Sequence, residues 1–265
     1  MTVAASAEVH PSALVEPGAT IGPGCRIGPF SIVGGDVTLG PGVEIRSHVV
    51  VTGWTEIGAE TTVFPFSVIG EIPQDLKFAG ERTRLVLGAR NRIREHVTMN
   101  AGTEGGGGIT RIGDDGLFMA GCHIAHDCQV GDRVIVVNAS AVAGHCVLED
   151  DVIVGGLSGI HQWVRIGQGA IIGALSMVTN DVVPYGLVQG PRAELDGLNL
   201  VGLKRRGVDR TDIQALRVAL LTLKQGDGTF IERARRLGEE AESAYVKRMI
   251  AFITGASDRS FLVPK

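Results

Sequence analysis

The chain of 265 residues lacks the features that mark a protein for nucleic acid, for a membrane or for secretion. Its 25 Lys and Arg are outnumbered by 29 Asp and Glu, and aromatic residues make up only 5% of it, so neither a basic arm nor an aromatic stacking platform is expected. No run is long and apolar enough to span a membrane. Residues 1–11 lack the charged and apolar regions of a signal peptide. We therefore expect a cytoplasmic protein with no nucleic-acid partner and no membrane span.

The sequence is instead rich in aliphatic residues at every sixth position. The first run consists of Val9, Val15, Ile21, Ile27, Val33, Leu39, Ile45, Val51, Ile57, Val63 and Ile69. Six is not the period of a helix or of strand alternation, so it is the repeat of a structural unit. Four residues after each aliphatic position stands a small or β-branched residue, such as Ala13, Cys25 or Thr55. Glycine often follows the aliphatic residue, as at Gly22 and Gly28, where we expect sharp corners.

This pattern is typical of a triangular parallel β-helix, because each short strand sends one large and one small residue into a narrow interior. Hexapeptide repeats of this kind resemble those of the left-handed β-helix, an exception to the usual right-handed crossover. We therefore expect an all-β solenoid of that hand.

The register of the repeat breaks twice. It stops at about Glu71, resumes at Leu87 and breaks again over the glycine-rich residues 102–108. It then continues from Ile112 to Val178. Loops that interrupt a rigid scaffold are where function tends to lie.

The pattern ends after Pro184. We predict a left-handed β-helix domain over 1–190, with loops near 71–86 and 100–111, and a helical domain over 191–265.

Residues 191–265 have helical spacing. Thr211 and Gln214 have the spacing of a capping box, and Gly226 would end that helix. The apolar positions expected for three helices are Ile213, Leu216, Leu220 and Leu223 for the first, Phe230, Ala234 and Leu237 for the second, and Tyr245, Met249 and Phe252 for the third. A solenoid needs its open end covered, so we expect a C-terminal α-helical cap.

Cysteine is scarce, and all of it falls in the small inward phase of the repeat. The four residues are Cys25, Cys122, Cys128 and Cys146. Thiol side chains are readily buried, and the cytoplasm keeps them reduced. We expect compact core residues, with no disulfide and no metal pair.

Histidines gather on one flank of the expected prism. Three hexads make one coil, so residues 18 apart stack at about the 4.8 Å spacing of a sheet. His126, His145 and His161 lie in successive coils at outward positions, and His123 lies at the preceding corner. Buried core histidines are therefore disfavoured, which leaves scattered surface histidines as the alternative. Imidazoles that titrate near neutrality, in a cleft between packed subunits, suit general acid–base chemistry.

Two neighbours of His126 suit the same chemistry. Gly144 lies one coil above His126, and a glycine there leaves its backbone N–H exposed toward whatever His126 acts on, as an oxyanion hole requires. Asp127 could support His126 only if the corner turns its side chain back, because adjacent residues of an extended strand point apart.

Several long motifs in a fixed order, spread over the whole chain, then make the sequence recognisable. They are 121–130 (GCHIAHDCQV), 70–81 (GEIPQDLKFAGE), 90–95 (RNRIRE), 143–145 (AGH), 160–162 (IHQ) and 202–207 (GLKRRG). With these motifs the chain resembles the UDP-N-acetylglucosamine acyltransferases, which begin lipid A synthesis. The resemblance implies a homotrimer with active sites between subunits. It also implies transfer of an (R)-3-hydroxyacyl chain from acyl carrier protein to the glucosamine 3-position of a UDP-sugar, with no metal and no cofactor beyond the carrier's phosphopantetheine arm.

The resemblance assigns roles that agree with the chemistry. His126 is the general base, the Gly144 amide holds the oxyanion, and Asp127 orients or supports the base. No acyl-enzyme is needed, since no cysteine lies outward. The positions that the resemblance places at the substrates are Gln74, Asp75, Lys77, His123, His145, His161, Gln162, Asn199 and Arg205. Without it, Asp75 and Lys77 would be read as part of a solvated loop.

Other segments carry weaker indications. Five arginines, Arg82, Arg84, Arg90, Arg92 and Arg94, concentrate positive charge that could steer an acidic carrier protein. Pairing with Glu81 and Glu95 is the alternative. The glycines at 105–108 lack the Lys-Ser/Thr of a phosphate loop, so we expect a flexible loop.

The chain departs from the family pattern at a few positions. Phe78 replaces the family's usual tyrosine, and Val201 replaces a glutamate that commonly contacts the nucleotide. Asn100 and Ala101 replace a His-Arg pair. The contacts that Val201, Asn100 and Ala101 would make to sugar and nucleotide are therefore left undetermined by the resemblance. Ala174 matches a glycine that closes the acyl groove in relatives that use longer chains. Arg192 would lie one coil above it if the coil persisted past Pro184.

Alternatives remain open. Some relatives acylate a 3-amino group, and the related UDP-3-O-acylglucosamine N-acyltransferase normally carries an N-terminal domain ahead of its repeats. From another class, clustered histidines on a trimeric β-helix could form a zinc hydratase of the carbonic anhydrase type.

Overall fold

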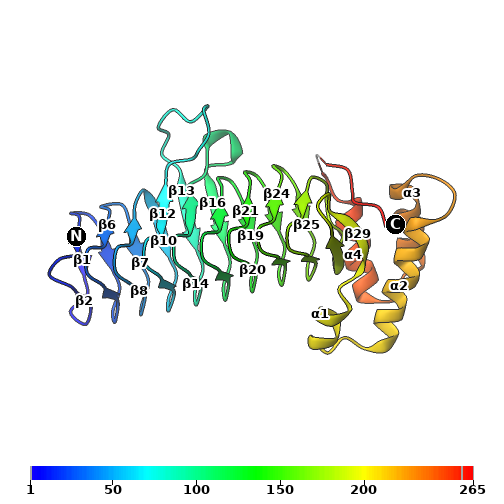
Figure 1. Ribbon diagram of the computed structural model, residues 1–265, viewed down its shortest axis with the longest axis horizontal. Coiled ribbons are helices and arrows are strands. Elements are labelled where there is room, and N and C mark those ends of the chain that lie inside the picture. The colour runs from blue at the N-terminus through cyan, green and yellow to red at the C-terminus, as the bar shows by residue number, and fades with distance from the viewer. Residues whose placement is uncertain (1, 258, 265) are drawn as a thin grey trace.

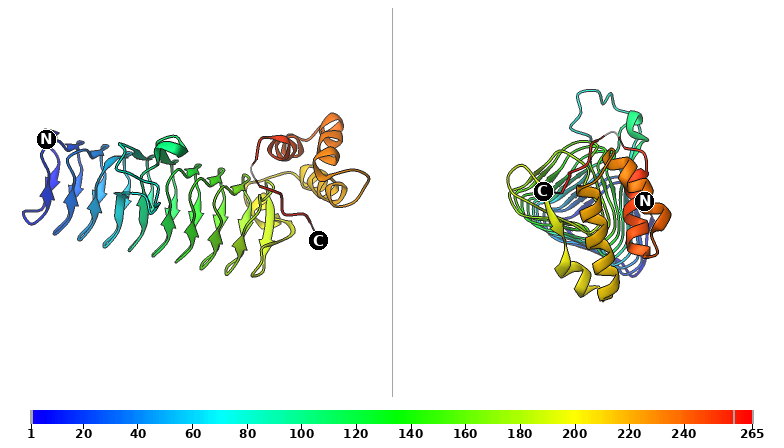
Figure 2. Two further views of the ribbon diagram at one scale, coloured as in Figure 1. Left: turned by 90° about the horizontal axis from the view of Figure 1, so that it is seen from above. Right: turned by 90° about the vertical axis from the view of Figure 1, so that its right-hand side faces the viewer.

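The computed structural model describes residues 2–257 and 259–264, which form a long three-sided coil that ends in a small group of helices (Figure 1). Seen nearly along its axis, the coil has a roughly triangular section (Figure 2). It is a left-handed parallel β-helix, as the hexad predicts. Each side of the prism is one sheet in which strands from successive coils stack in parallel.

Two sides are nine-stranded sheets. One contains β1 (Thr2–Val3), β4 (Thr20–Ile21), β7 (Thr38–Leu39), β10 (Trp54–Ile57), β13 (Arg84–Leu87), β16 (Ile109–Ile112), β19 (Gln129–Val130), β22 (Val147–Leu148) and β25 (Arg165–Ile166). The other contains β3 (Leu14–Val15), β6 (Ile32–Val33), β9 (Val50–Val51), β12 (Val68–Glu71), β15 (Thr98–Asn100), β18 (His123–Ile124), β21 (Ala141–Val142), β24 (Gly159–Ile160) and β27 (Met177–Val178).

The third side is longer. Its eleven strands are β2 (Glu8–Val9), β5 (Arg26–Ile27), β8 (Glu44–Ile45), β11 (Thr62–Val63), β14 (Arg92–Ile93), β17 (Leu117–Phe118), β20 (Ile135–Val136), β23 (Ile153–Val154), β26 (Ile171–Ile172), β28 (Gly186–Gln189) and β29 (Glu194–Leu198). Strand β29 pairs antiparallel with β28, which ends the parallel stack.

Two loops leave the prism without disturbing its layers. The usual offset between stacked strands is 18 residues, as from Thr2 in β1 to Thr20 in β4. It rises to 30 between Trp54 in β10 and Arg84 in β13, and to 25 between β14 and β17. The extra residues form loops 72–83 and 101–108, which project from one side of the prism (Figure 1). The second loop contains one short 3₁₀ helix, η1 (Glu104–Gly106).

The corner glycines are required for a reason other than the expected one. Gly22 and Gly28 do not have positive φ; instead, a Cβ on either would lie 2.9 Å or less from backbone of the next coil. The left-handed backbone falls two residues later, at Gly24 (φ 69°) and Phe30 (φ 59°). Close approach of coils therefore selects the first glycine, and the turn itself accepts other residues.

The core is one continuous cluster: the aliphatic and small positions of the repeat fill the inside of the prism, and the apolar faces of the helices continue it at the C-terminal end. All four cysteines are buried free thiols, as expected. The Cys128 thiol donates to the Ala143 carbonyl oxygen at 3.1 Å. Burial raises the pKa of the Cys122 thiol to about 12, so this group stays neutral and unreactive.

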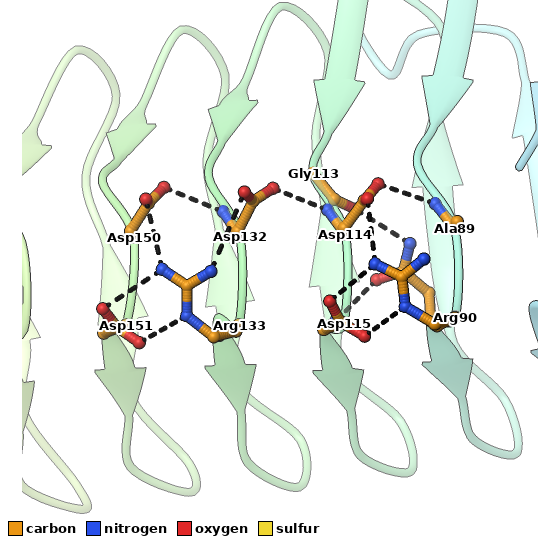
Figure 3. Close-up of polar contacts among 11 residues, drawn as sticks. Ala89, Arg90, Gly113, Asp114, Asp115, Asp132, Arg133, Asp150 and Asp151 are labelled. Atoms are coloured by element: carbon orange, nitrogen blue, oxygen red, sulfur yellow. Dashed lines mark hydrogen bonds and ion pairs between the residues drawn. The ribbon is translucent and has the colours of Figure 1, made fainter. Parts of the chain in front are cut away.

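One corner carries a ladder of aspartates (Figure 3). The Oδ1 atoms of Asp114, Asp132 and Asp150 each accept a backbone N–H from the preceding coil at 2.8–3.0 Å. Arg90 and Arg133 bridge these carboxylates to the neighbouring corner aspartates. The two arginines offset part of the negative charge of this column, and its hydrogen bonds join consecutive coils.

The helices lie at the far end of the prism (Figure 1). They are α1 (Leu200–Arg205), α2 (Arg210–Lys224), α3 (Phe230–Glu240) and α4 (Ala244–Thr254). The apolar positions predicted for three helices fall in α2, α3 and α4. The predicted capping box at Thr211 is wrong, because Asp209 is the N-cap of α2 and Thr211 lies inside the helix. The capping box is at Thr229 and Glu232 in α3.

In the described part of the chain no helix has both the length and the apolar character needed to cross a lipid bilayer.

Candidate active site

The site lies at the corner that joins β18 to β19, beneath the two projecting loops. Three residues 18 apart, Asp127, His145 and Trp163, occupy the same position in successive coils, with φ of 60°, 63° and 66°. Each side chain points out of the corner because left-handed backbone turns the chain sharply there. The corner thus stacks a carboxylate, an imidazole and an indole.

His126 and Asp127 form a buried pair. The Nδ1 atom of His126 lies 2.8 Å from Oδ2 of Asp127, so Nδ1–H donates to the carboxylate and Nε2 remains as the proton acceptor. The corner turns the Asp127 side chain back, which satisfies the condition set for this residue from the sequence. This is the geometry of a base held by an orienting carboxylate.

The outward position predicted for His126 does not leave it exposed to solvent. Its position is outside the prism, but only 5% of His126 is exposed, and Asp127 is 4% exposed. The loop 101–108 covers them: Thr103 bonds to Asp127, and Gly106 lies against the same carboxylate. The repeat predicts which side of the strand faces out, but it does not predict what a loop will cover.

Gly144 lies against the His126 ring, as its place one coil above predicts. A Cβ at Gly144 would lie 2.6 Å from Nε2 of His126, so any larger residue would displace the base. The neighbouring corner amide of His145 donates to the His126 carbonyl oxygen. The Gly144 N–H makes no hydrogen bond within the described residues. A free N–H beside Nε2 can bind an oxyanion.

His145 completes a cluster with this pair. Its ring meets the His126 ring edge-on with centroids 4.9 Å apart, and its Nδ1 lies 3.7 Å from Oδ2 of Asp127. Burial lowers the pKa of the His145 imidazole, and the Asp127 carboxylate opposes only part of this shift. The Trp163 ring stacks on the His145 ring, with the ring centroids 3.8 Å apart and an angle of 2° between the ring planes. Trp163 was not among the predicted site residues, although its spacing of 18 from His145 was a usable signal.

A pocket of about 190 Å³ opens between the two loops and this corner. The residues that line it are Asp75, Lys77, Phe78 and Glu81 from loop 72–83, Thr103, Glu104 and Gly105 from loop 101–108, and His145 and Trp163 from the corner. Asp75 and Lys77 are therefore brought to the histidine cluster, whereas Gln74 is exposed and outside this pocket. Three charged residues of this loop, Asp75, Lys77 and Glu81, thus line the same pocket as His145.

The remaining histidines of the flank differ in surroundings. His123 bonds to the Thr98 hydroxyl at 2.7 Å, and burial, followed by the neighbouring His126, lowers the pKa of its imidazole. His161 and Gln162 are exposed. The His161 Nδ1 and the Gln162 carbonyl oxygen accept from Arg259 of the C-terminal segment, at 2.7 and 3.1 Å. No sequence pattern predicted this contact.

Asn199 and Arg205 lie elsewhere in the chain. Asn199 is buried and caps α1: its Oδ1 accepts from Gly202 N at 2.9 Å, and its Nδ2 donates to the Gly169 carbonyl oxygen. Arg205 lies in the last turn of α1. Figure 1 places α1 at the end of the prism, well removed from the projecting loops. One chain alone does not bring these residues to His126.

The positions that depart from the family pattern can now be placed. Asn100 is buried, and its amide donates to the Glu71 and Ile72 carbonyl oxygens, which anchors the start of loop 72–83. Phe78 lines the pocket. Val201 is 61% exposed on α1.

The proposed stacking of Arg192 on Ala174 is wrong. Ile171 pairs with Leu187, an offset of 16 rather than 18, because the chain takes a shorter path past Pro184. The residue one layer above Ala174 in this register is Gly190. Arg192 lies exposed in the turn between β28 and β29, and Ala174 is itself exposed.

The arginine cluster is largely paired. Arg82 lies 3.6 Å from Asp36, Arg84 bonds to Glu56, Arg90 bonds to Asp114 and Asp115, and Arg94 bonds to Glu95. Glu81 accepts from the Ala79 N–H instead of pairing with an arginine. Within the described residues, Arg92 is the one member of the five that has no acidic partner.

The comparisons with known proteins agree with this geometry. Residues 181–262 match the family described as UDP-N-acetylglucosamine O-acyltransferase, domain 2, and residues 18–53 match the bacterial transferase hexapeptide family. The chain is 66% identical over 202 residues to an acyl-[acyl-carrier-protein]–UDP-N-acetylglucosamine O-acyltransferase of Paracoccus denitrificans, which covers 76% of this chain and 77% of the relative. It is 48% identical to the enzyme of that name from Rhizobium johnstonii, over 99% of this chain and 97% of the relative.

A solved structure is similar over nearly the whole chain. The UDP-N-acetylglucosamine acyltransferase from Campylobacter jejuni superposes with a TM-score of 0.91 at 40% identity, covering 97% of this chain and 100% of that structure. Sequence, fold and the His126 corner thus lead to one assignment: the chain belongs to the acyl-[acyl-carrier-protein]–UDP-N-acetylglucosamine O-acyltransferase family.

Proposed function

We propose that this protein is an acyltransferase that moves an (R)-3-hydroxyacyl chain from acyl carrier protein to the 3-hydroxyl of UDP-N-acetylglucosamine, the first step of lipid A biosynthesis. The observation that carries the proposal is the buried hydrogen bond of 2.8 Å between His126 Nδ1 and Asp127, with the Nε2 side of the ring against Gly144, whose N–H makes no hydrogen bond within the described residues. Family membership supplies the substrates, and this corner supplies a base and an oxyanion site side by side.

The reaction follows from these groups. Nε2 of His126 takes the proton of the sugar 3-hydroxyl, which is far too weak an acid to attack a thioester unaided. The sugar oxygen bonds to the thioester carbon, and the Gly144 N–H binds the resulting oxyanion. When the C–S bond breaks, the imidazolium returns the proton to the thiol of the phosphopantetheine arm. Asp127 stabilises the imidazolium, so no acyl-enzyme and no further cofactor are needed.

Substrate contacts are assigned to the surrounding residues. In this proposal Asp75 and Lys77 hold the sugar in the pocket between the loops, with Gln74 beside them. His123, His145, His161 and Gln162 line the rest of the cleft. Asn199 and Arg205 contact the nucleotide, where a guanidinium suits a diphosphate. Since α1 is removed from His126 in one chain, a neighbouring subunit of a homotrimer would supply this contact. A cytoplasmic location belongs to the same proposal.

The contacts around His126 bear directly on the alternative of a zinc hydratase. The potential ligand atoms of His126, Asp127 and His145 lie within 4.8 Å of one another, and two imidazoles with a carboxylate are a zinc ligand set. Both Asp127 oxygens, however, already accept hydrogen bonds, from the Thr103 N–H, the Thr103 hydroxyl and His126. A metal would have to displace these donors, so the hydrogen-bonded pair is favoured.

The test is an assay of purified protein with acyl carrier proteins of graded chain length and with both the 3-hydroxyl and the 3-amino UDP-sugar. Wild type should acylate the 3-hydroxyl sugar with metal removed. Replacing the base in His126→Ala should lower the rate by about 10² to 10⁴. Acylation of the 3-amino sugar alone would favour the amide-forming alternative, and transfer to a UDP-3-O-acylglucosamine would favour the N-acyltransferase. A stoichiometric zinc required for activity, or a His126→Ala variant close to the wild-type rate, would overturn the proposal.

A further inference from the structure

The glycine-rich loop 101–108, expected to be a flexible connection, is bonded to the catalytic pair. The Thr103 N–H donates to Oδ1 of Asp127 at 2.8 Å, and the Thr103 hydroxyl donates to Oδ2 at 2.6 Å. Thr103 is 8% exposed and Asp127 4%. Bonds to a buried carboxylate at these distances are charge-assisted and strong. One loop residue therefore holds both oxygens of the group that orients His126.

The same hydroxyl also fixes the shape of the loop. Thr103 is the N-cap of η1, and its Oγ accepts from the Gly106 N–H at 3.2 Å. Gly106 packs so closely that a Cβ there would lie 2.1 Å from the Asp127 carboxyl carbon. The Thr103 hydroxyl thus donates to Asp127 and at the same time accepts from Gly106. The conformation of the loop and the position of the carboxylate are coupled through it.

The loop faces the substrate side as well. Glu104 and Gly105 directly follow the threonine that holds Asp127. They line the same pocket as Asp75 and Lys77. A displacement of the loop would move the pocket wall and release the carboxylate together.

We propose that Thr103 is a positioning residue of this enzyme: it locks the Asp127 carboxylate so that His126 presents Nε2 to the sugar hydroxyl. This inference rests on the proposed function, because it acts through the base assigned there. Without the hydroxyl, Oδ2 keeps only His126 as a hydrogen-bond partner, and the loop holds the carboxylate through the Thr103 N–H to Oδ1 alone, so the carboxylate is less firmly fixed. The base would then be misaligned in the transition state while the sugar still binds through loop 72–83.

The first experiment compares Thr103→Val, Thr103→Ser and a matched control. Thr103 has φ −117° and ψ 155°, which a valine adopts without strain. The control is Thr61→Val, because the Thr61 hydroxyl is also buried, donates to the Gly88 carbonyl oxygen and accepts from the Asn91 N–H. Thr61 lies at the corner between β10 and β11, whereas the two loops leave the prism after β12 and β15. We expect kcat of Thr103→Val to fall about ten- to a hundredfold with KM within about threefold, since a hydrogen bond to a charged group is lost. Thr103→Ser should recover most of kcat, and Thr61→Val should lower Tm without lowering kcat.

A valine variant within about threefold of the wild-type kcat, or a serine variant no better than valine, would sink the proposal. An equal fall in kcat for Thr61→Val would reduce the effect to general destabilisation and also overturn it. If His126→Ala remains active, the proposed function fails. A dead His126→Ala variant beside a fully active Thr103→Val variant rejects the positioning role alone.

A second pair of variants serves if Thr103→Val does not fold. Gly106→Ala places a methyl on the Asp127 carboxylate, whereas a Cβ on Gly105, the adjacent residue of η1, meets nothing within 4 Å. We expect Gly106→Ala to lose at least tenfold more kcat than Gly105→Ala at unchanged Tm. Equal losses for the two variants would contradict the coupling of loop and carboxylate.

Discussion

The backbone of Asp127 is what makes it useful to His126. A non-glycine residue in the left-handed region costs about 1–2 kcal/mol, and Asp127 has φ of 60°. Hydrogen bonds offset this cost: the Asp127 N–H donates to the Thr110 hydroxyl at 2.7 Å, and Thr103 holds both carboxylate oxygens. Loop 101–108 thus holds Asp127 in this strained backbone conformation. The conformation in turn places the carboxylate against the adjacent His126 ring.

Ala174 allows a residue-scale prediction about chain length. The family resemblance implies that it takes the place of a glycine in relatives that use longer acyl chains, and it is exposed. An added methylene of acyl chain gains only about 0.8 kcal/mol on burial, which a steric clash easily exceeds. We expect Ala174→Gly to shift preference toward longer hydroxyacyl chains. Competition between carrier-bound chains of graded length measures the shift, and an unchanged profile would show that Ala174 does not limit the chain.

Part of the site was predictable from the sequence, and the rest depended on loop contacts. Spacing alone placed Gly144 above His126, because the repeat fixes which residues stack. Segments outside the repeat determine the rest. They bury His126, bring the Thr103 hydroxyl to Asp127 and bring Arg259 to His161. The path of such a segment follows from packing that no periodicity encodes.

At the scale of elements, one buried ion pair ties the last coils to the C-terminal segment. Asp181 is fully buried and accepts from Arg165 Nε at 2.7 Å and from the Ser257 hydroxyl at 2.6 Å. Arg165 also lies 4.5 Å from the Phe252 ring centroid in α4. The pair therefore joins β25 to the helical cap.

Removing Asp181 should loosen that junction. We expect Asp181→Ala to lower the free energy of unfolding by about 3–5 kcal/mol, because it leaves the Arg165 charge without its partner in a buried site. The matched control is Asp115→Ala at the exposed Arg90 pair, where the loss should stay below about 1 kcal/mol. Thermal unfolding measures the stability, and limited proteolysis should show faster cleavage of the C-terminal segment in Asp181→Ala only. Similar Tm values for the two variants would contradict this role.

The repeating elements were predictable almost in full, whereas the end of the prism was not. The hexad sets strand positions because each aliphatic residue must enter the same core column. Past Pro184 the coil continues through β28 with its offset reduced to 16, which the missing hexad signal did not indicate. The start of α2 was also placed wrongly, since an internal Thr211 has the same spacing to Gln214 as a true cap.

At the scale of the whole molecule, the separation of α1 from His126 predicts a shared site. We expect a trimer of three times the 27.8 kDa chain mass in analytical ultracentrifugation. Co-expression of His126→Ala with Arg205→Ala should restore part of the activity that each variant lacks, because mixed trimers contain sites in which both residues are intact. A monomeric mass, or no recovery in verified mixed trimers, would contradict a site built between subunits.

The offsets of 30 and 25 residues between stacked strands also show that inserting the loops of such a site costs a coil little free energy. Closing a loop of n residues costs roughly (3/2)RT ln n, so these coils lose only about 0.5 and 0.3 kcal/mol of chain entropy relative to a coil of 18. The layers above and below keep their pairing. A catalytic cover can therefore lengthen or shorten with almost no thermodynamic penalty to the scaffold, and selection on substrate can act on the loops independently of selection on folding.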